Sequence, residues 1–429
     1  MTYVAYLFAS DAGGFGDDGS ESIIKCGSFN STALNNLGWE PQWVLMKNTS
    51  STSGWFMMDS MRGMTASTNA TTYNGSSPFL YANATQIETA ATGLIAPAAT
   101  GFGSGQSGTY IYIAIRRPMK TPESGTEVFA VTTRTGNGAV TGLTAAGFPP
   151  DLYWAKSTGA VRVHSIFDRL RGPLPVLNSA STQNEIAYTD GLQSFDMTGV
   201  TTGTDGSTNG YNQNSQVYVN WYLKRATGFM DVVCYTGTGS ATTQAHNLGV
   251  VPEMMIVKRR DSTGNWMVYG ATPNPEQKYL AINLTDAAAT ASWSWNNTSP
   301  TATNFTLGTG SAVNGSGGTF VNYLFATVAG VSKVGSYTGT FTNTTIDCGF
   351  TNGARYVLIK RTDATGAWYV WDSARGITSG NDPFLLLNED GDGGTGNYIE
   401  AQASGFAVND TAGGPVNING ATYIFLAIA

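Results

Sequence analysis

The chain has few charged residues: Asp, Glu, Lys and Arg make up 12% of its 429 residues, against about 25% in an ordinary globular protein. Long surface helices need such residues on their exposed faces, so the composition argues against them. Thr, Ser, Asn and 53 glycines take their place, and these residues are typical of turns between short strands. The composition therefore predicts a β-rich protein.

Histidine and cysteine are scarcer still, with 2 His and 3 Cys in the whole chain. The three cysteines, Cys26, Cys234 and Cys348, are far apart and form no CxxC pair, which argues against a disulfide scaffold or a thiolate zinc site. Ser-His-Asp or Cys-His catalysis has equally little to build on. We expect no catalytic, cofactor-binding or metal residues and a protein that is not an enzyme.

Targeting signals and basic patches are also missing. No window of 18 apolar residues predicts a membrane span, and the N-terminus lacks the basic region of a signal peptide. The formal net charge of -7 leaves no basic stripe for a phosphate backbone. We therefore expect a soluble protein that folds in a reducing cell interior, with no nucleic-acid partner and no membrane insertion.

An aromatic segment recurs about every 105 residues along the chain. Its five copies are Tyr3–Ala9, Tyr110–Ile115, Tyr218–Leu223, Phe320–Phe325 and Tyr423–Ile428. Four modules are predicted between these copies: module 1 (residues 10–117), module 2 (118–225), module 3 (226–328) and module 4 (329–429). Residues 1–9 are then an orphan copy of the closing strand, and we expect it to pair across a subunit boundary, because an unpaired strand edge invites aggregation.

Within each module an apolar segment ends in a lysine, and a ring follows eight residues later. Such a segment predicts a buried strand that ends where the chain returns to water, and the pair predicts a β-hairpin. The lysines are Lys47, Lys156, Lys258 and Lys360, and the rings are Trp55, His164, Trp266 and Trp368. His164 stands in a packing position that is Trp elsewhere.

The motif Asp-x-x-Arg-Gly follows each ring except in module 3, where Gly270 and Pro273 replace Asp and Arg. A further short strand then ends in Asn in every module. The motif residues are Asp59 and Arg62, Asp168 and Arg171, and Asp372 and Arg375; the asparagines are Asn83, Asn178, Asn283 and Asn388. The charged pair could hold a sugar hydroxyl or a metal, or it could be an internal ion pair of Asp with the strand-end Lys or with Arg. Repetition favours the structural role.

Many short strands with a turn every 8–15 residues or so are typical of antiparallel sandwiches. A four-bladed propeller is disfavoured, because a repeat of about 105 residues is twice the 40–50 of a typical blade. We therefore predict an all-β fold of four tandem antiparallel β-sandwich-like modules.

Carboxylates gather in two glycine-rich segments: Asp11, Asp17 and Asp18 in the first, and Glu389, Asp390 and Asp392 in the second. Solvated turns are the favoured interpretation. Calcium, which takes oxygen ligands from such loops, is the alternative, and a pair of carboxylates is also what glycoside hydrolysis needs.

The sequence resembles the tail-fibre-like repeat modules of structural proteins of marine tailed phages. The resemblance lies in GSYTG (residues 335–339), PEMMIVKRRDSTGNW (252–266), WYVWDSARG (368–376) and the aromatic closing strand, as at residues 110–117. It extends over the whole chain through four copies, and module 2 is the most divergent. It implies a phage structural module, with no catalytic residue to carry over.

Together these patterns predict a non-enzymatic virion protein, assembled in the host cytoplasm. The first choice is a tail fibre or tail-associated protein that presents loops to a host glycan or protein during adsorption. The alternatives are a capsid decoration or cement protein, and a polysaccharide depolymerase that uses Asp or Glu pairs. We expect a homo-oligomer, most simply a trimer, that also contacts other virion proteins.

Overall fold

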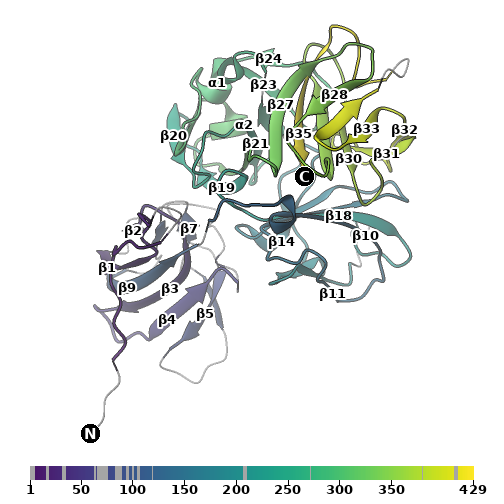
Figure 1. Cartoon of the computed structure of the whole chain (residues 1–429). Coiled ribbons are helices and arrows are strands. Elements are labelled where there is room, and N and C mark those ends of the chain that lie inside the picture. The colour runs from purple at the N-terminus through teal and green to yellow at the C-terminus, as the bar shows by residue number, and fades with distance from the viewer. Residues whose placement is uncertain are drawn as a thin grey trace. The chain divides into compact units, whose positions relative to one another are not determined.

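The computed structural model describes residues 5–15, 19–30, 35–61, 64, 76–82, 89–92, 96–98, 101–103, 107–117, 119–205, 210–270, 272–378, 380–409 and 414–429. The chain divides into two compact units, unit 1 (Met1–Lys120) and unit 2 (Thr121–Ala429) (Figure 1). The predicted boundaries near residues 225 and 328 therefore lie inside unit 2. We keep the names of modules 1 to 4 for their residue ranges.

Unit 1 contains a six-stranded antiparallel sheet in the order β1-β9-β3-β4-β5-β6 and a three-stranded sheet in the order β2-β8-β7. The strands are β1 (Ile24–Asn30), β2 (Asn35–Asn36), β3 (Pro41–Asn48), β4 (Trp55–Asp59), β5 (Ser76–Tyr81), β6 (Thr89–Thr92), β7 (Ala96–Ala98), β8 (Gly101–Gly103) and β9 (Thr109–Arg116). Val44, Met46 and Tyr110 of the large sheet pack with Phe102 of the small one. Residues 5–9 lie outside any strand and are exposed.

Residues 5–9 of the predicted orphan strand form no strand within the single chain, and residues 3 and 4 lie outside the described part of the chain. Pairing across a subunit boundary stays a prediction. The closing strand β9 lies between β1 and β3, so the position that the orphan copy could take in module 1 is already filled.

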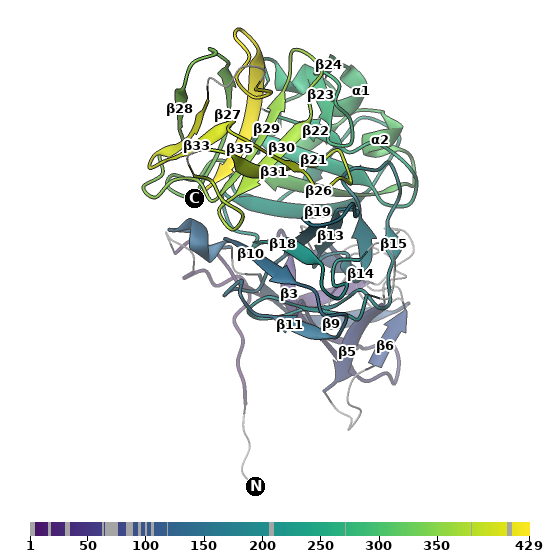
Figure 2. The ribbon, with the colours of Figure 1, turned by 90° about the vertical axis from the view of Figure 1, so that its right-hand side faces the viewer.

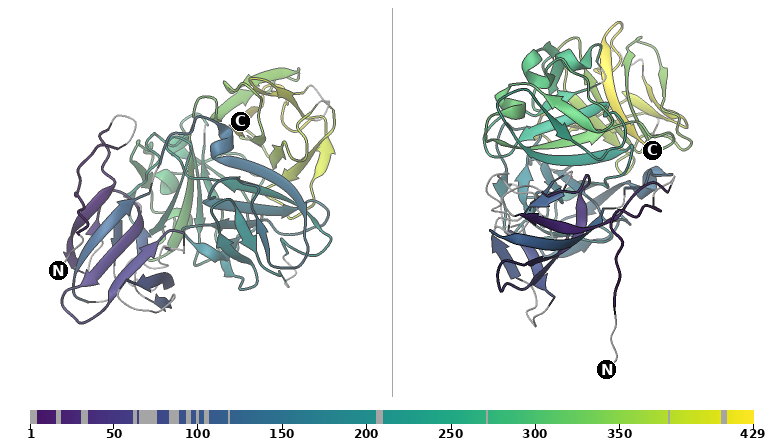
Figure 3. Two further views of the ribbon diagram at one scale, coloured as in Figure 1. Left: turned by 60° about the horizontal axis from the view of Figure 1, so that its bottom comes forward. Right: turned by 90° about the vertical axis from the view of Figure 1, so that its left-hand side faces the viewer.

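Unit 2 contains three more six-stranded sheets with the same strand order. Figures 2 and 3 show the strands of this unit, coloured from blue through green to yellow, gathered in one body. Module 2 has β10-β18-β12-β13-β14-β15 beside β11-β17-β16. Its elements are η1 (Gly125–Glu127), β10 (Phe129–Thr135), β11 (Thr141–Leu143), β12 (Leu152–Ser157), β13 (Ser165–Asp168), β14 (Gly172–Leu177), β15 (Ile186–Ala187), β16 (Leu192–Phe195), β17 (Val200–Thr202) and β18 (Val217–Leu223).

Module 3 has β19-β26-β21-β22-β23-β24 beside the pair β20-β25. Its elements are β19 (Met230–Thr236), β20 (Thr242–Ala245), β21 (Met254–Arg259), β22 (Met267–Tyr269), η2 (Pro275–Gln277), β23 (Lys278–Ala281), β24 (Ala289–Thr290), α1 (Ser292–Trp295), β25 (Asn304–Leu307), α2 (Ser311–Asn314) and β26 (Thr319–Phe325).

Module 4 has β27-β35-β29-β30-β31-β32 beside β28-β34-β33. Its strands are β27 (Ser332–Thr338), β28 (Thr344–Asp347), β29 (Tyr356–Arg361), β30 (Trp368–Asp372), β31 (Asp382–Leu386), β32 (Gly394–Gly396), β33 (Ile399–Gln402), β34 (Gly405–Val408) and β35 (Thr422–Ile428). The prediction of an all-β protein of antiparallel, sandwich-like modules is confirmed. None of the helices in the described residues has the length and hydropathy to span a membrane.

The closing strands of unit 2 are buried on both faces of their sheets. In β18, Tyr218 and Tyr222 pack on the small sheet of their own module. Val219, Trp221 and Leu223 point to the opposite face, because side chains alternate along a strand, and join a core shared with modules 3 and 4. We call this opposite surface of each large sheet its outer face. In unit 2 the three outer faces pack together.

Candidate functional site

The strand-end lysines of modules 3 and 4 are buried at junctions between modules. Lys258 and Lys360 each donate to a carbonyl of their own hairpin, at 2.6 and 2.7 Å. Each also donates to the preceding module, to Thr182 O at 2.9 Å and to Thr285 O at 3.0 Å. The prediction that these lysines meet water is wrong, because carbonyls of the neighbouring module take the place of water. Burial lowers the pKa of both amines to about 8.

The lysine of module 2 completes a closed cycle of contacts among the three modules of unit 2, which we call the ring of modules. Lys156 is 1% exposed and its Nζ donates to Asp390 O of module 4 at 3.3 Å. The lysine of module 3 thus donates to module 2, that of module 4 donates to module 3, and that of module 2 donates to module 4. Such a closed cycle of like contacts has the form of a trimer built from a single chain.

The tryptophans that follow these lysines, in modules 3 and 4, make contacts in the same cyclic order. Trp266 Nε1 donates to Asn178 O of module 2, and Trp368 Nε1 donates to Ala281 O of module 3, both at 2.8 Å. The asparagine that ends the next strand of the same module accepts the backbone N–H of each tryptophan, at 2.9 and 2.8 Å. The recurring Asn therefore positions the recurring Trp.

His164 takes the place of tryptophan in module 2 and is fully buried. Its Nδ1 accepts from Trp154 Nε1 at 3.0 Å, and its Nε2 lies 3.1 Å from Leu386 O and 3.2 Å from Glu389 O of module 4. Burial, reinforced by nearby Lys156, lowers the pKa of the imidazole to about 3. His164 is therefore a neutral residue that joins modules 2 and 4.

We expect acid to weaken unit 2 through His164. The imidazole has a pKa near 6.5 when unfolded and about 3 when folded, so the unfolded state binds the proton first and stability falls as the pH drops below 6.5. The loss between pH 7 and pH 5 is about 2 kcal/mol. Chemical denaturation at the two pH values measures it. The matched variant His164→Gln keeps a donor and an acceptor and should lose this part of the pH dependence; equal pH dependence in both proteins would contradict the assignment.

The Asp-x-x-Arg motif forms a buried corner in modules 2 and 4. The carboxylates of Asp168 and Asp372 are fully buried and form ion pairs with Arg171 and Arg375. The other carboxylate oxygen accepts the backbone N–H of the same arginine, at 2.9 and 3.0 Å. The glycine after each arginine has a φ of 88° or 125°, which favours glycine. Of the two partners considered for Asp, arginine is the one that the structure shows.

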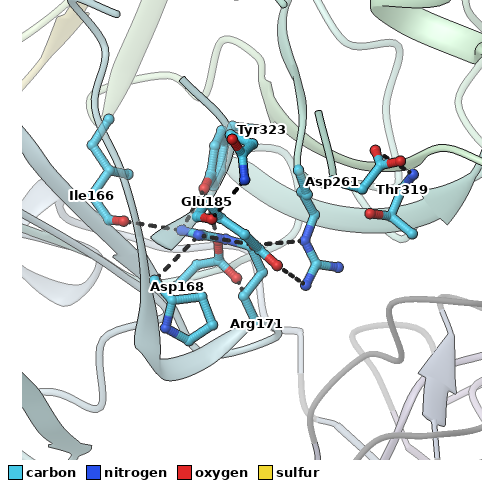
Figure 4. Close-up of polar contacts among 10 residues, drawn as sticks. Ile166, Asp168, Arg171, Glu185, Asp261, Thr319 and Tyr323 are labelled. Atoms are coloured by element: carbon cyan, nitrogen blue, oxygen red, sulfur yellow. Dashed lines mark hydrogen bonds and ion pairs between the residues drawn. The ribbon is translucent and has the colours of Figure 1, made fainter. Parts of the chain in front are cut away.

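Each corner also receives a hydrogen bond from the closing strand of another module. Tyr323 Oη of module 3 donates to Asp168 Oδ2 at 2.7 Å (Figure 4). Trp221 Nε1 of module 2 donates to Asp372 Oδ2 at 3.1 Å. The buried corners therefore join modules in the same cyclic order as the strand-end lysines and the aromatic side chains that follow them.

The junction of modules 3 and 4 lacks both parts of this contact. Gly270 stands where Asp is expected, and Leu426, at the position of Trp221 and Tyr323 in the closing strand of module 4, has no polar atom to donate. A Cβ added to Gly270 would lie 2.9 Å from Ile424 Cδ1, so the apolar side chains of module 4 fill the space that a carboxylate needs. Acceptor and donor are absent together, so no unpaired charge is left buried.

A charged network that sequence reasoning missed extends the corner of module 2. Arg171 Nη1 lies 3.6 Å from Glu185 Oε2 (Figure 4). Arg260 of module 3 pairs with the same carboxylate at 2.9 and 3.1 Å. Neither Glu185 nor Arg260 belongs to a repeated motif, so the sequence gives no signal for them. Tyr323 and Trp221 do have one, because each is a ring with a polar atom inside the recurring aromatic strand.

The corresponding residues of unit 1 are less buried. Lys47, Trp55 and Asp59 are all partly exposed. Lys47 Nζ donates to Ser53 O of its own hairpin, and Asp59 Oδ1 accepts from the backbone N–H of Met61 at 3.0 Å. Arg62, the fourth predicted residue of this module, lies outside the described residues.

The acidic segments behave differently from one another. Asp390 of module 4 binds module 2, because its carboxylate accepts from Asn178 Nδ2 at 3.1 Å and its carbonyl accepts from Lys156. Asp11 forms an ion pair with Lys25 at 3.7 Å, whereas Asp17 and Asp18 lie outside the described residues. Within the described ranges, no three His, Cys, Asp or Glu side chains form a group that could hold a metal ion.

A small apolar cavity of about 30 Å³ lies in the shared core of unit 2. Residues from all three modules line it, among them Trp221, Ile256 and Tyr356. The cavity presents no polar surface, and binding sites for polar ligands need a few converging polar groups. It is a gap in the packing at the centre of the ring.

These contacts define an all-β protein whose recurring charged and aromatic residues join three sandwiches into one compact unit. The chain belongs to the family described as a domain of unknown function (DUF7483), whose model matches residues 1–118 and 124–429. No curated protein matches the chain.

Proposed function

We propose that the protein is a non-enzymatic virion component of a tailed phage, a tail fibre or tail-associated protein that presents surface loops to the host envelope. The observation that carries the proposal is the use of the recurring charged residues. In unit 2 these lysines and Asp-Arg pairs are buried in contacts between modules, so they build a scaffold. The resemblance to phage tail-fibre modules supports the same function.

Such a scaffold suits loops that bind by many weak contacts. Polar loops held by a β framework can present hydroxyls, amides and flat rings with little loss of entropy, and repeated modules multiply weak binding into avidity. Phe341, in the turn after β27, is 46% exposed and has a φ of 58°. The buried side chain of Asn417 accepts from the backbone N–H of Thr340 at 2.9 Å and fixes this turn. An exposed phenyl ring held in a strained backbone fits a receptor contact.

The proposed location can be tested on intact phage particles. Gold-labelled antibody raised against the purified chain should mark the tail. Labelling of the head alone would replace the proposal by a capsid decoration protein, and particles without label would overturn both. Release of reducing sugar from host polysaccharide by the purified chain would show a depolymerase instead.

Replacing Phe341 by Ser should lower binding of the purified chain to host cells about tenfold or more, because loss of an exposed aromatic contact can remove more than 1.4 kcal/mol. Cell binding of the fluorescently labelled chain measures the effect. Val140→Ser changes another apolar residue, 61% exposed, and serves as the control. Unchanged binding by the Phe341 variant would exclude this turn from the contact, whereas the antibody experiment tests the location independently.

A further inference from the structure

Module 1 has the same large sheet as the modules of unit 2, including the register of its central strands. Trp43 of β3 lies opposite Ile115 of β9, Leu45 opposite Ile113, and Lys47 opposite Ile111. Residues directly opposite one another share a face of the sheet. We call this surface, made of Trp43, Leu45, Ile111, Ile113 and Ile115, the outer face of module 1; it is the counterpart of the outer faces in unit 2.

The outer face of module 1 is as apolar as its counterparts but much less buried. Ile111 is 41% exposed, and the other four side chains are partly exposed. The residues at the position of Ile111 in the other closing strands, Val219, Val321 and Ile424, are 0%, 0% and 1% exposed. An apolar sheet face of this kind is normally covered.

The three outer faces of unit 2 cannot cover it, because each is already buried in the shared core of the other two. In that core each outer face packs against the other two outer faces, which have the same strand order. The two faces that module 1 lacks must then come from two other chains. We propose that three copies of the protein join through the outer faces of module 1 and form, between chains, the ring that modules 2 to 4 form within one chain.

The polar groups at the rim of this face fit the same arrangement. Lys47 donates to the carbonyl of Ser53 in its own hairpin, as Lys258 and Lys360 do in theirs. In unit 2 each of these lysines has a second acceptor, on the neighbouring module. In the proposed trimer the second acceptor of Lys47 comes from the neighbouring chain.

The ring residue has an equivalent acceptor. Tyr81 pairs with β4 in the register in which Ala281 pairs with β22 and Leu386 with β30. The carbonyls of Ala281 and Leu386 receive Trp368 and His164 of the next module. Tyr81 therefore has, in module 1, the strand position whose carbonyl accepts from the neighbouring module in unit 2.

One contact of the ring in unit 2 is not reproduced. Ile113 stands at the position of Trp221 and Tyr323, and its side chain has no N–H or O–H group to donate to the Asp59 carboxylate of a neighbour. The junction in module 1 is therefore more apolar and lacks the strong bonds to a buried carboxylate. We expect an association that reverses on dilution, in contrast to the ring of unit 2, which the chain itself holds together.

Sedimentation velocity on the full chain tests the proposal. At tens of micromolar the expected mass is three times the 45.2 kDa of the chain, and Ile113→Glu should reduce it to that of the monomer. Val140→Glu, which adds the same charge at an exposed residue of unit 2, should remain trimeric. A wild type that stays monomeric or dimeric would overturn the proposal, as would a trimer that survives Ile113→Glu.

Two further variants keep the test decisive. If near-UV circular dichroism shows that Ile113→Glu disturbs the fold, Ile111→Lys places a charge at the most exposed residue of the same face and should also give a monomer. A chain with Tyr6→Asp and Leu7→Asp alters the exposed segment of residues 5–9 and should remain trimeric. Loss of the trimer in this last variant alone would assign the contact to strand exchange and overturn the role of the outer face.

Discussion

Replacing Asp168 by alanine should lower the free energy of unfolding of unit 2 by about 3–5 kcal/mol, as expected when one partner of a buried ion pair is removed. Arg171 has no exposed side-chain surface and keeps its charge. In the variant its nearest carboxylate is that of Glu185, at 3.6 Å. The Tyr323 hydroxyl also loses its acceptor. Guanidinium chloride denaturation followed by tryptophan fluorescence measures the loss.

An exposed ion pair provides the control for Asp168. Asp363 pairs with Arg361 at 3.0 Å, and both side chains are partly exposed to solvent. Asp363 also accepts the backbone N–H of Thr422 at 3.0 Å. Asp363→Ala should therefore cost only about 1–2 kcal/mol, about 0–1 for the ion pair and about 1 for this hydrogen bond. If the two alanine variants lost the same free energy, the buried corner of module 2 would be no more important than a surface pair, contrary to its place in the ring.

The strand pattern of each module follows from its sequence because the contacts that form it are local. The structure pairs Lys47 with Trp55 and Lys360 with Trp368 across one hairpin, as the eight-residue spacing predicts. Apolar runs, turn residues and rings are all within a few residues of one another there. The all-β class and the antiparallel pairing could be predicted for this reason.

The fate of the charged residues could not be predicted in the same way. A lysine at the end of an apolar run looks alike whether water or another module lies beyond it, and only the tertiary contacts of Lys258 with Thr182 decide between them. The closing strands did contain a usable signal. Val217–Leu223 is apolar at nearly every position, which is typical of a strand covered on both faces, whereas a free sandwich has one solvated face.

The junction of modules 3 and 4 shows why the Asp-x-x-Arg motif alone is a weak guide to function. Within unit 2, Asp is present at the corner where another module supplies Tyr323 or Trp221 as a donor, and it is absent where Leu426 stands in the same strand position. Module 1 keeps Asp59 with Ile113 at that position. A ligand-binding carboxylate would have no reason to vary with a residue in the next module, as the carboxylate does within unit 2. The variation within one chain therefore favours a role in joining modules.

Trp368→Ala should also destabilise unit 2 strongly, by about 3–5 kcal/mol, the range for removal of a large buried ring. The indole is completely buried in the shared core, and its loss removes the hydrogen bond that joins module 4 to the Ala281 carbonyl of module 3. Because the three modules close a ring, the loss at the junction of modules 3 and 4 should weaken all of them together. Differential scanning calorimetry should show one unit 2 transition shifted to lower temperature.

Trp55→Ala, at the equivalent position of unit 1, provides the matched comparison. It should leave the unit 2 transition unchanged and weaken the association of chains, so that its effect depends on protein concentration while that of Trp368→Ala does not. Stepwise melting of the Trp368 variant, with module 4 lost while modules 2 and 3 stay folded, would contradict a cooperative ring. The same side chain would then stabilise one sandwich alone, and the cyclic order of the junctions would have no energetic consequence.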